Sequence, residues 1–312
     1  MKRNVKIFSS KFSKDLTEKI CQKFDGDPIN NLKLTRFSDN EFITKIDDTV
    51  RGCDVFVVSA CPSSAESIWE MLMISDALKR ASAAKIIGVF AYLPYSRQDK
   101  KNESREPIAA KLLADTLQVA GYNRIVTIDV HADQIQGFYN IPVDHLSANY
   151  IFVPHIKQLN LENLVFASPD AGGGKRAEKF AQMFDTDLVF CHKTRPRANV
   201  IGKMKLVGDV AGKDVIIIDD LIDTAGTICK AADLMMENGA NSVRAIITHP
   251  VLSGKAYENL ENSSLLELIT TDSIPTKKCD KITVLSVDEM LAHAIKNINE
   301  NESISSTFDL KK

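Results

Sequence analysis

The chain of 312 residues lacks several features that would point to whole classes of protein. It contains no apolar run close to the ~20 residues that a membrane-spanning helix needs. Its net charge is −2, which provides no basic field for nucleic acid. Its six cysteines are scattered without a Cys-x-x-Cys pair, so we expect reduced thiols and no zinc site. The N-terminus has no signal-peptide core. We therefore expect a cytoplasmic protein that binds neither membrane nor nucleic acid.

Apolar runs of strand length alternate with amphipathic segments of helix length along almost the whole chain. Hydrophobic residues make up 44% and charged residues 26% of the sequence, which is ordinary for a globular protein. The alternation predicts an α/β fold with parallel sheets. The expected strands are 55–59, 86–92, 125–129, 164–168, 215–219, 243–248 and 266–271, and the expected helices are 67–81, 108–120, 175–183 and 228–238.

The length suits two domains of about 150 residues each. The strand and helix patterns form two clusters, separated where Pro142 and Pro154 bracket sequence that we expect to be irregular. We therefore predict an N-terminal α/β domain over 1–148 and a C-terminal α/β domain over 149–312. Each domain is expected to carry a mainly parallel sheet flanked by helices.

The run from Val215 to Thr227 carries the strongest functional signal. An apolar, β-branched run ends in Asp219 and Asp220, and a loop of small and hydroxyl residues leads into a helical pattern. Such a turn directs backbone N–H groups and the positive end of the helix dipole at one point, which suits a phosphate. The two carboxylates suit sugar hydroxyls or a magnesium ion beside that phosphate. A helix cap needs only one carboxylate, so we favour a site for a phosphorylated sugar.

Three further polar clusters follow predicted strands, where the ligands of open α/β sheets bind. The glycine-rich run 170–176 opens a predicted helix, and both helix-start punctuation and ligand binding fit it. His131 is either a hydrogen-bonded structural histidine or a metal ligand, although magnesium prefers oxygen. The charged loop 97–101 is either solvated or one wall of a purine and phosphate pocket.

Two other segments stay open between a surface role and a binding role. Lys193 and Arg195 would lie on one side of an extended segment, because side chains alternate along it. They belong either to a solvated basic loop or to a loop that closes over a polyphosphate. Phe37 precedes Asp39 and Glu41 in what is either a surface turn or a stacking face with acceptors for an adenine or a ribose.

These clusters, in this order, resemble the ribose-phosphate diphosphokinase family, also called phosphoribosyl-diphosphate synthetases. The 219–227 loop alone is also similar to the phosphoribosyl-diphosphate loop of type I phosphoribosyltransferases. The matching motifs include Arg36-Phe37-Ser38-Asp39-x-Glu41, Tyr95-x-Arg97-Gln98-Asp99, His131-Ala132-Asp133-Gln134-Ile135-Gln136-Gly137-Phe138 and Ser168-Pro169-Asp170-x-Gly172-Gly173. The His131–Phe138 run is the part that phosphoribosyltransferases do not share.

The resemblance implies two similar phosphoribosyltransferase type I-like domains and a magnesium-dependent reaction. In that reaction the β,γ-diphosphoryl group of ATP passes to the 1-hydroxyl of ribose 5-phosphate, which gives 5-phosphoribosyl 1-diphosphate and AMP for nucleotide biosynthesis. The implied site residues are Phe37, Asp39, Asn40, Glu41, Arg97 and Gln98 for ATP; His131, Asp170, Asp219 and Asp220 for magnesium; Lys193 and Arg195 for catalysis; and Arg195, Asp219, Asp220, Asp223, Thr224, Ala225, Gly226 and Thr227 for ribose 5-phosphate.

The resemblance also implies a homo-oligomer, a hexamer of dimers, that phosphate activates and ADP inhibits. The chain departs from the family pattern at Asn40, which replaces a usual glycine, and at Thr194, which replaces a common arginine. Asn tolerates a positive φ, so we expect the turn at Asn40 to need one.

Two alternative functions are weighed against the synthetase. A phosphoribosyltransferase would explain the 219–227 loop but not the His131–Phe138 run. A non-catalytic regulatory subunit of the same family would be suggested by loss of Lys193, Arg195, His131 or Asp219, and all four are present.

Overall fold

The computed structural model describes residues 4–24, 32–60, 64–170, 172–193 and 204–304. By internal contacts the chain divides into two compact units. Unit 1 comprises Met1–Tyr150, Ser273–Pro275 and Ser286–Lys312, and unit 2 comprises Ile151–Asp272 and Thr276–Leu285. Within the described ranges, no helix combines the length and the apolar character that crossing a membrane requires.

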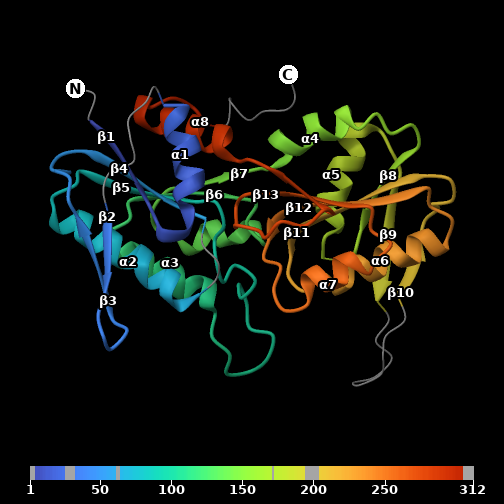
Figure 1. The fold of residues 1–312 in the computed structure, drawn as a ribbon, viewed down its shortest axis with the longest axis horizontal. Helices are drawn as coiled ribbons and strands as arrows, with labels where there is room; N and C mark the ends of the chain where they lie inside the picture. Colours follow the sequence, from blue (N-terminus) through green and yellow to red (C-terminus); the bar gives the residue numbers. More distant parts are fainter. Residues whose placement is uncertain (1–3, 25–31, 61–63, 171, 194–203, 305–312) are drawn as a thin grey trace. The chain divides into compact units, whose positions relative to one another are not determined.

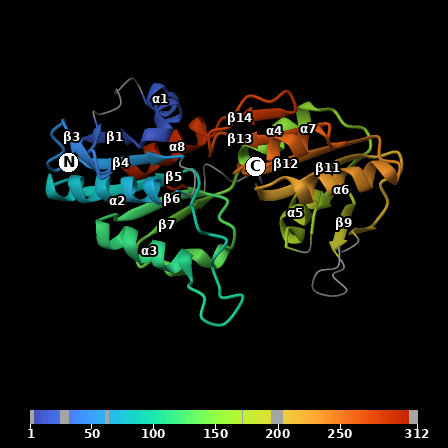
Figure 2. The same ribbon diagram turned by 60° about the horizontal axis from the view of Figure 1, so that its bottom comes forward.

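Unit 1 is built on a five-stranded sheet in the order β1-β4-β5-β6-β7, with all neighbouring strands parallel. The 3-10 helix η1 (Lys11–Ser13) follows β1, and η2 (Asp133–Phe138) follows β6. Helices α1 and α8 lie on one face of the sheet and α2 and α3 on the other (Figure 1, Figure 2). The elements are β1 (Val5–Ser9), α1 (Lys14–Gln22), β4 (Asp54–Ser59), α2 (Ala65–Arg80), β5 (Lys85–Phe90), α3 (Ala109–Ala120), β6 (Arg124–Ile128), β7 (Val143–Leu146) and α8 (Asp288–Glu300).

A separate antiparallel hairpin projects from unit 1. Its strands are β2 (Leu32–Arg36) and β3 (Phe42–Ile46), which pair from Leu32 with Ile46 to Arg36 with Phe42. Leu32 and Ile46 pack against the core that α2 and α3 form with the sheet. The opposite end of the hairpin is therefore the turn at 37–41, which carries several of the predicted ATP residues.

Unit 2 holds a seven-stranded sheet in the order β10-β9-β8-β11-β12-β13-β14. Neighbouring strands are parallel except β10, which runs antiparallel to β9. Helix α5 lies on one face and α6 and α7 on the other (Figure 1). The elements are α4 (Asn149–Gln158), β8 (Leu164–Ser168), α5 (Gly174–Phe184), β9 (Leu188–Lys193), β10 (Met204–Val207), β11 (Asp214–Ile222), α6 (Gly226–Glu237), β12 (Ser242–Pro250), α7 (Ala256–Glu261), β13 (Glu267–Thr271) and β14 (Ile282–Leu285).

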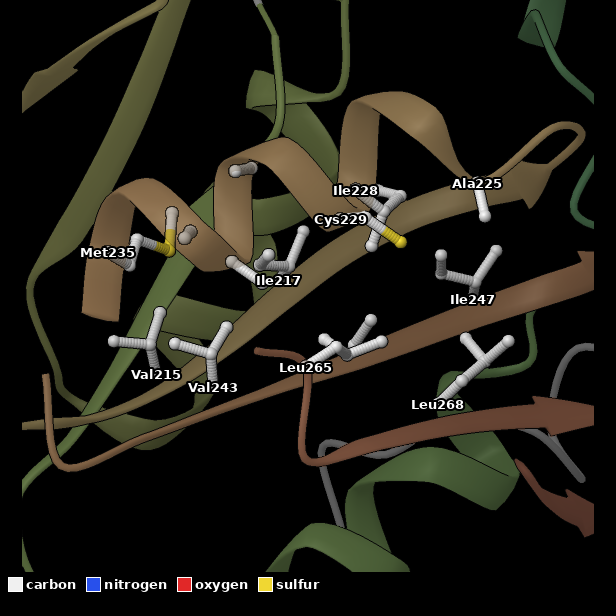
Figure 3. Packing of buried hydrophobic residues seen from close by; sticks show 14 of the residues in the cluster. Val215, Ile217, Ala225, Ile228, Cys229, Met235, Val243, Ile247, Leu265 and Leu268 are labelled. Atoms are coloured by element: carbon white, nitrogen blue, oxygen red, sulfur yellow. The ribbon is translucent and has the colours of Figure 1, made fainter. Parts of the chain in front are cut away.

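The apolar face of α6 anchors the loop that precedes it. Ile228 and Met235 of α6 pack with Ile217 of β11 and Ile247 of β12, and all four side chains are fully or almost fully buried (Figure 3). Burying a side chain of this size stabilises the fold by roughly 1.5–3 kcal/mol. Ala225, in the turn between β11 and α6, belongs to the same cluster, so the turn itself is fixed to the core (Figure 3).

The sequence predicted the main elements correctly, with one error of type. The seven expected strands correspond to β4, β5, β6, β8, β11, β12 and β13, and the four expected helices to α2, α3, α5 and α6. The prediction of irregular sequence between Pro142 and Pro154 is wrong, because β7 and α4 occupy it. Pro154 lies inside α4, where its missing N–H costs one helical hydrogen bond without ending the helix.

Candidate active site

In unit 1, two predicted clusters meet at the carboxyl ends of neighbouring strands. Strands β5 and β6 pair in parallel, so the loops that follow them lie at the same sheet edge. Gln134, beyond β6, donates from Nε2 to Asp99 Oδ2, beyond β5, at 3.0 Å. This contact brings the loop of Arg97 and Gln98 beside the loop of His131. The clustering expected from the sequence is therefore present within this unit.

The loop that carries His131 is held by a histidine that sequence reasoning missed. The backbone N–H of Val130 donates to His145 Nε2 at 3.1 Å, and Asp133 Oδ1 lies 3.6 Å from His145 Nδ1. Asp129, at the start of the loop, is buried and has a positive φ of 35°. His145 lies on β7, next to β6, in a segment that we had expected to be irregular. In the sequence, the sign of this role was that His145 is a polar residue in the strand that follows the His131 loop.

The turn of the β2–β3 hairpin presents Phe37 to solvent. Phe37 is 51% exposed, and its backbone N–H donates to Glu41 O at 2.8 Å. Asp39 Oδ1 accepts from the Glu41 N–H at 3.0 Å, so one carboxylate oxygen shapes the turn. Asn40 has a φ of 71°, which confirms the expected positive φ. An exposed ring on a fixed turn is a surface on which a base can stack.

Arg36 braces this turn from the adjoining strand. Its Nη1 donates to Asn40 O at 3.0 Å, and its guanidinium lies 5.6 Å from the centre of the Phe42 ring. Its Nη2 contacts the carboxylate of Glu66 on α2. The hairpin tip is thus tied to the main body of unit 1 by a charged pair that the sequence alone did not indicate.

In unit 2, Asp170 shapes the glycine-rich loop that precedes α5. Its Oδ1 accepts from the N–H groups of Gly172 at 2.8 Å and Gly173 at 3.2 Å, while Ser168 Oγ donates to its carbonyl at 2.6 Å. A Cβ on Gly173 would lie 3.0 Å from Ser168 Oγ and 3.7 Å from Asp219 Oδ1. Glycine therefore lets the start of α5 approach β11 closely. The loop marks the start of the helix and also lies beside Asp219.

Asp219 and Asp220 lie within β11, which continues beyond the predicted end of the strand. On one side β11 pairs with β8 only as far as Ile217, whereas on the other it pairs with β12 as far as Ile222. Burial, the charge of Asp220 and, less strongly, that of Asp170 raise the pKa of Asp219 well above its ordinary value. The three carboxylates therefore form a mutually repelling group at the carboxyl ends of β8 and β11.

The predicted phosphate loop follows directly. Ala225 adopts the left-handed conformation, with φ 61° and ψ −8°, and α6 begins at Gly226. Ser253 donates its backbone N–H to Asp223 O at 3.0 Å, and its hydroxyl contacts Asp223 Oδ1. Asn259 Nδ2 donates to Thr224 O at 2.8 Å. Loop 223–227 thus has its shape fixed by side chains and backbone from the segment after β12.

The predicted residues divide between the two units. The ATP residues and His131 belong to unit 1, and Asp170, Asp219, Asp220 and the phosphate loop belong to unit 2. Among the residues that the structure describes, no group of three or more His, Cys, Asp or Glu side chains is arranged to hold a metal. Lys193 is the last residue of β9, and Arg195 and Thr194 lie outside the described residues.

Comparison with known proteins identifies the family. The model for the N-terminal domain of ribose phosphate pyrophosphokinase matches residues 5–121, and the phosphoribosyl synthetase-associated domain matches residues 189–309. The ribose-phosphate pyrophosphokinase of Porphyromonas gingivalis is 47% identical over 307 residues, which cover 98% of each chain. That of Wolinella succinogenes is 46% identical over 308 residues, covering 98% of this chain and 99% of the relative.

A solved structure agrees with these relatives. The crystal structure of phosphoribosylpyrophosphate synthetase from Mycobacterium smegmatis matches with a TM-score of 0.91 and 38% identity, over 96% of this chain and all of that one. The resemblance that the motifs predicted is confirmed, and with it the expectation of an enzyme with an α/β fold. The chain therefore belongs to the ribose-phosphate pyrophosphokinase family, enzymes that transfer the diphosphoryl group of ATP to ribose 5-phosphate.

Proposed function

We propose that the two units divide the work of this reaction between the two substrates. Unit 1 supplies the ATP residues: the exposed ring of Phe37 as a stacking face, the polar groups of the hairpin turn, and Arg97 with Gln98 beyond β5. Unit 2 supplies the ribose 5-phosphate residues. Asp219 and Asp220 accept hydrogen bonds from the ribose hydroxyls, and loop 223–227 directs its N–H groups at the 5-phosphate.

One observation carries the sugar assignment. A pair of carboxylates near the carboxyl end of β11 is followed within a few residues by a left-handed turn and the start of α6. The helix N-terminus favours an anion, whereas the carboxylates favour hydroxyl donors or a cation. A ligand with a phosphate at one end and hydroxyls a few atoms away satisfies both requirements, and ribose 5-phosphate has that form.

The chemistry of the donors suits magnesium, although the described carboxylates do not form a ready-made group of three ligands. Asp170, Asp219 and Asp220 offer carboxylate oxygens, which magnesium prefers, and one or two carboxylates together with water and phosphate oxygens are its usual ligands. A divalent cation would also offset the neighbouring charges that, together with burial, raise the pKa of Asp219. His131, in unit 1, is proposed as a ligand of the magnesium that accompanies ATP. The bound ion would supply neutralisation of phosphate charge during transfer. No protein group here is assigned as a general base for the sugar hydroxyl.

The protein's own cations complete the proposed chemistry. Lys193 and Arg195 are assigned to neutralise charge that develops on the transferring group and on the departing AMP, and Arg195 also contacts the sugar phosphate. In-line positioning of the two substrates supplies much of the remaining rate enhancement. We also propose that the enzyme works in the cytoplasm as a hexamer of dimers, which phosphate activates and ADP inhibits.

The function is tested by AMP formation from ATP in purified protein, with magnesium and with or without ribose 5-phosphate. Sugar-dependent AMP, at one equivalent per 5-phosphoribosyl 1-diphosphate, is the expected result. If no AMP forms at any phosphate concentration, the chain is a regulatory subunit and the catalytic proposal is wrong. If turnover instead requires 5-phosphoribosyl 1-diphosphate and a nucleobase, the chain is a phosphoribosyltransferase.

A further inference from the structure

Three successive carbonyl groups at the end of β11 are all held by one neighbouring segment. Ile222 O accepts from the N–H of Leu252 at 3.0 Å, and Asp223 O accepts from the N–H of Ser253 at 3.0 Å. Thr224 O accepts from Asn259 Nδ2 at 2.8 Å. The first two donors are backbone groups, so the third is the one that depends on the identity of a side chain.

The direction of a carbonyl fixes the direction of the next N–H. In a trans peptide the C=O of one residue and the N–H of the following residue point in opposite directions within one plane. The described residues contain no cis peptide bond. The N–H groups of Asp223, Thr224 and Ala225 therefore each point away from the segment 252–259, and for Ala225 this direction is set through the amide of Asn259.

The same peptide precedes a strained residue. Ala225 has a φ of 61°, in the left-handed region that is unfavourable for a residue other than glycine. Its side chain is buried in the core beneath α6, which holds the residue from one side (Figure 3). Asn259 holds the preceding peptide from the other side. Successive N–H groups around a left-handed residue form a concave anion site, so keeping this conformation keeps the phosphate cradle.

We infer that Asn259 is a positioning residue for ribose 5-phosphate: by binding the Thr224 carbonyl it orients the Thr224–Ala225 peptide so that the Ala225 N–H faces the 5-phosphate. Asn259 itself does not contact the substrate. The inference rests on the proposed function, because it takes loop 223–227 as the 5-phosphate site. Its contribution falls on sugar binding and not on ATP binding or on the transfer step.

The test is steady-state kinetics on the full-length enzyme, with Asn259→Leu as the main variant. Leucine matches asparagine in size and removes the amide donor without adding charge. We expect the KM for ribose 5-phosphate to rise about tenfold, while kcat and the KM for ATP change less than twofold. Asn259→Gln keeps the amide on a longer side chain and should stay within about threefold of the wild-type KM.

Matched variants separate this role from a general effect on stability. Asn262→Leu makes the same change at the exposed residue that follows α7, and it should leave every kinetic constant unchanged. Asn259→Ala serves as a second truncation if the leucine variant does not fold, and Tm values check that both remain native. A structural role alone would lower kcat and raise both KM values together, or lower only the yield of active enzyme.

The outcomes are distinguishable. An unchanged KM for ribose 5-phosphate in a folded Asn259→Leu enzyme would overturn the inference and leave the proposed function intact. A rise of equal size in the KM for ATP would also overturn it. If the wild-type enzyme makes no sugar-dependent AMP, the proposed function itself fails before any variant is compared.

Discussion

Asp219 and Asp220 are adjacent in the chain, yet the sheet gives them different surroundings. Asp220 is 8% exposed, and its backbone N–H donates to Asp219 Oδ1 at 2.9 Å. Asp219 faces the start of α5 and feels the charge of Asp170. Because the charges of Asp220 and Asp170 both act against ionisation of Asp219, neutralising Asp220 relieves repulsion on Asp219. The effect of a neutral substitution therefore depends on what each carboxylate binds.

Asp220→Asn should raise the KM for ribose 5-phosphate about tenfold or more. Asparagine keeps the size of the side chain but presents one acceptor oxygen in place of two, so it binds ribose hydroxyls less well. The substitution also relieves repulsion on Asp219, which acts to lower the KM, but this relief cannot restore the lost acceptor. The measurement is AMP formation at varied sugar concentration. Asp280→Asn, at an exposed position outside the strands, is the control, and equal effects of the two changes would contradict the assignment.

The residues assigned to the ligand were easier to find in the sequence than those that hold their loops in place. Asp219, Asp220 and Thr224 stand together in one short run, whose residue types favour a phosphorylated sugar over a helix cap. Asn259, Ser253 and His145 stand far from the loops that they hold, and each is an ordinary polar residue in its own segment. Their roles follow from strand order, which a sequence without coordinates does not supply.

At the scale of elements, hydrophobic periodicity predicted well whether a segment is a helix or a strand, but it predicted the boundaries of the segments poorly. β8 was predicted with its observed bounds, because both its ends are marked by changes in polarity. β11 was predicted to end at Asp219 but continues to Ile222, because β12 supplies a ladder partner that compensates for the polar residues. β7 has only four residues and α4 contains a proline, so neither carries a pattern long enough to be recognised.

The contact between α2 and η1 depends on a buried acid. Glu70 of α2 is 2% exposed, and its Oε1 accepts from the backbone N–H of Lys11 at 2.7 Å. Burial raises the pKa of Glu70 above its ordinary value of 4.5, with a smaller contribution from the charge of Glu66; the Lys11 hydrogen bond and the Lys11 charge act in the opposite sense. Folding therefore disfavours ionisation of Glu70, because the buried charge costs more than the Lys11 contact returns.

Glu70→Gln should remove a pH-dependent loss of stability. The contribution of neutral Glu70 is fully present below pH 4.5 and is lost as pH rises through the raised folded pKa. Glutamine keeps an acceptor for the Lys11 N–H and does not ionise. At pH 7.5 we expect the variant to melt about 2–4 °C above the wild type, a shift that corresponds to ~1 kcal/mol. The advantage should shrink as pH falls toward 4.5.

Thermal unfolding at several pH values measures this difference. Glu18→Gln, at an exposed residue of α1, is the control, because it removes a carboxylate that is exposed and not buried. A wild-type protein that gains stability relative to Glu70→Gln as pH rises would show that the sign of the effect is wrong.

At the scale of the whole chain, the end of the sequence returns to the beginning. We predicted two consecutive domains divided at residue 148, whereas contacts place α8 with α1 and the first sheet in unit 1. β14, only a few residues before α8, lies in unit 2. The apolar residues of α8 could pack on either sheet, so the periodicity of the sequence does not show which sheet the helix covers. The chain order of the elements is therefore not the order in which they pack.

Weakening α8 should consequently destabilise the sheet of unit 1 and not the sheet of unit 2, although β14 of unit 2 is nearer to α8 in the sequence. Ile295 is fully buried, and Ile295→Ala should cost about 2–5 kcal/mol in unfolding free energy. In hydrogen exchange read by mass spectrometry, we expect faster exchange in α1 and β1, which belong to the same unit, and little change in β12 and β13. Leu268→Ala, at a fully buried position of β13, should give the reverse pattern. Faster exchange confined to β12 and β13 in the Ile295→Ala protein would instead support the division at residue 148, because α8 would then be covering the sheet of unit 2.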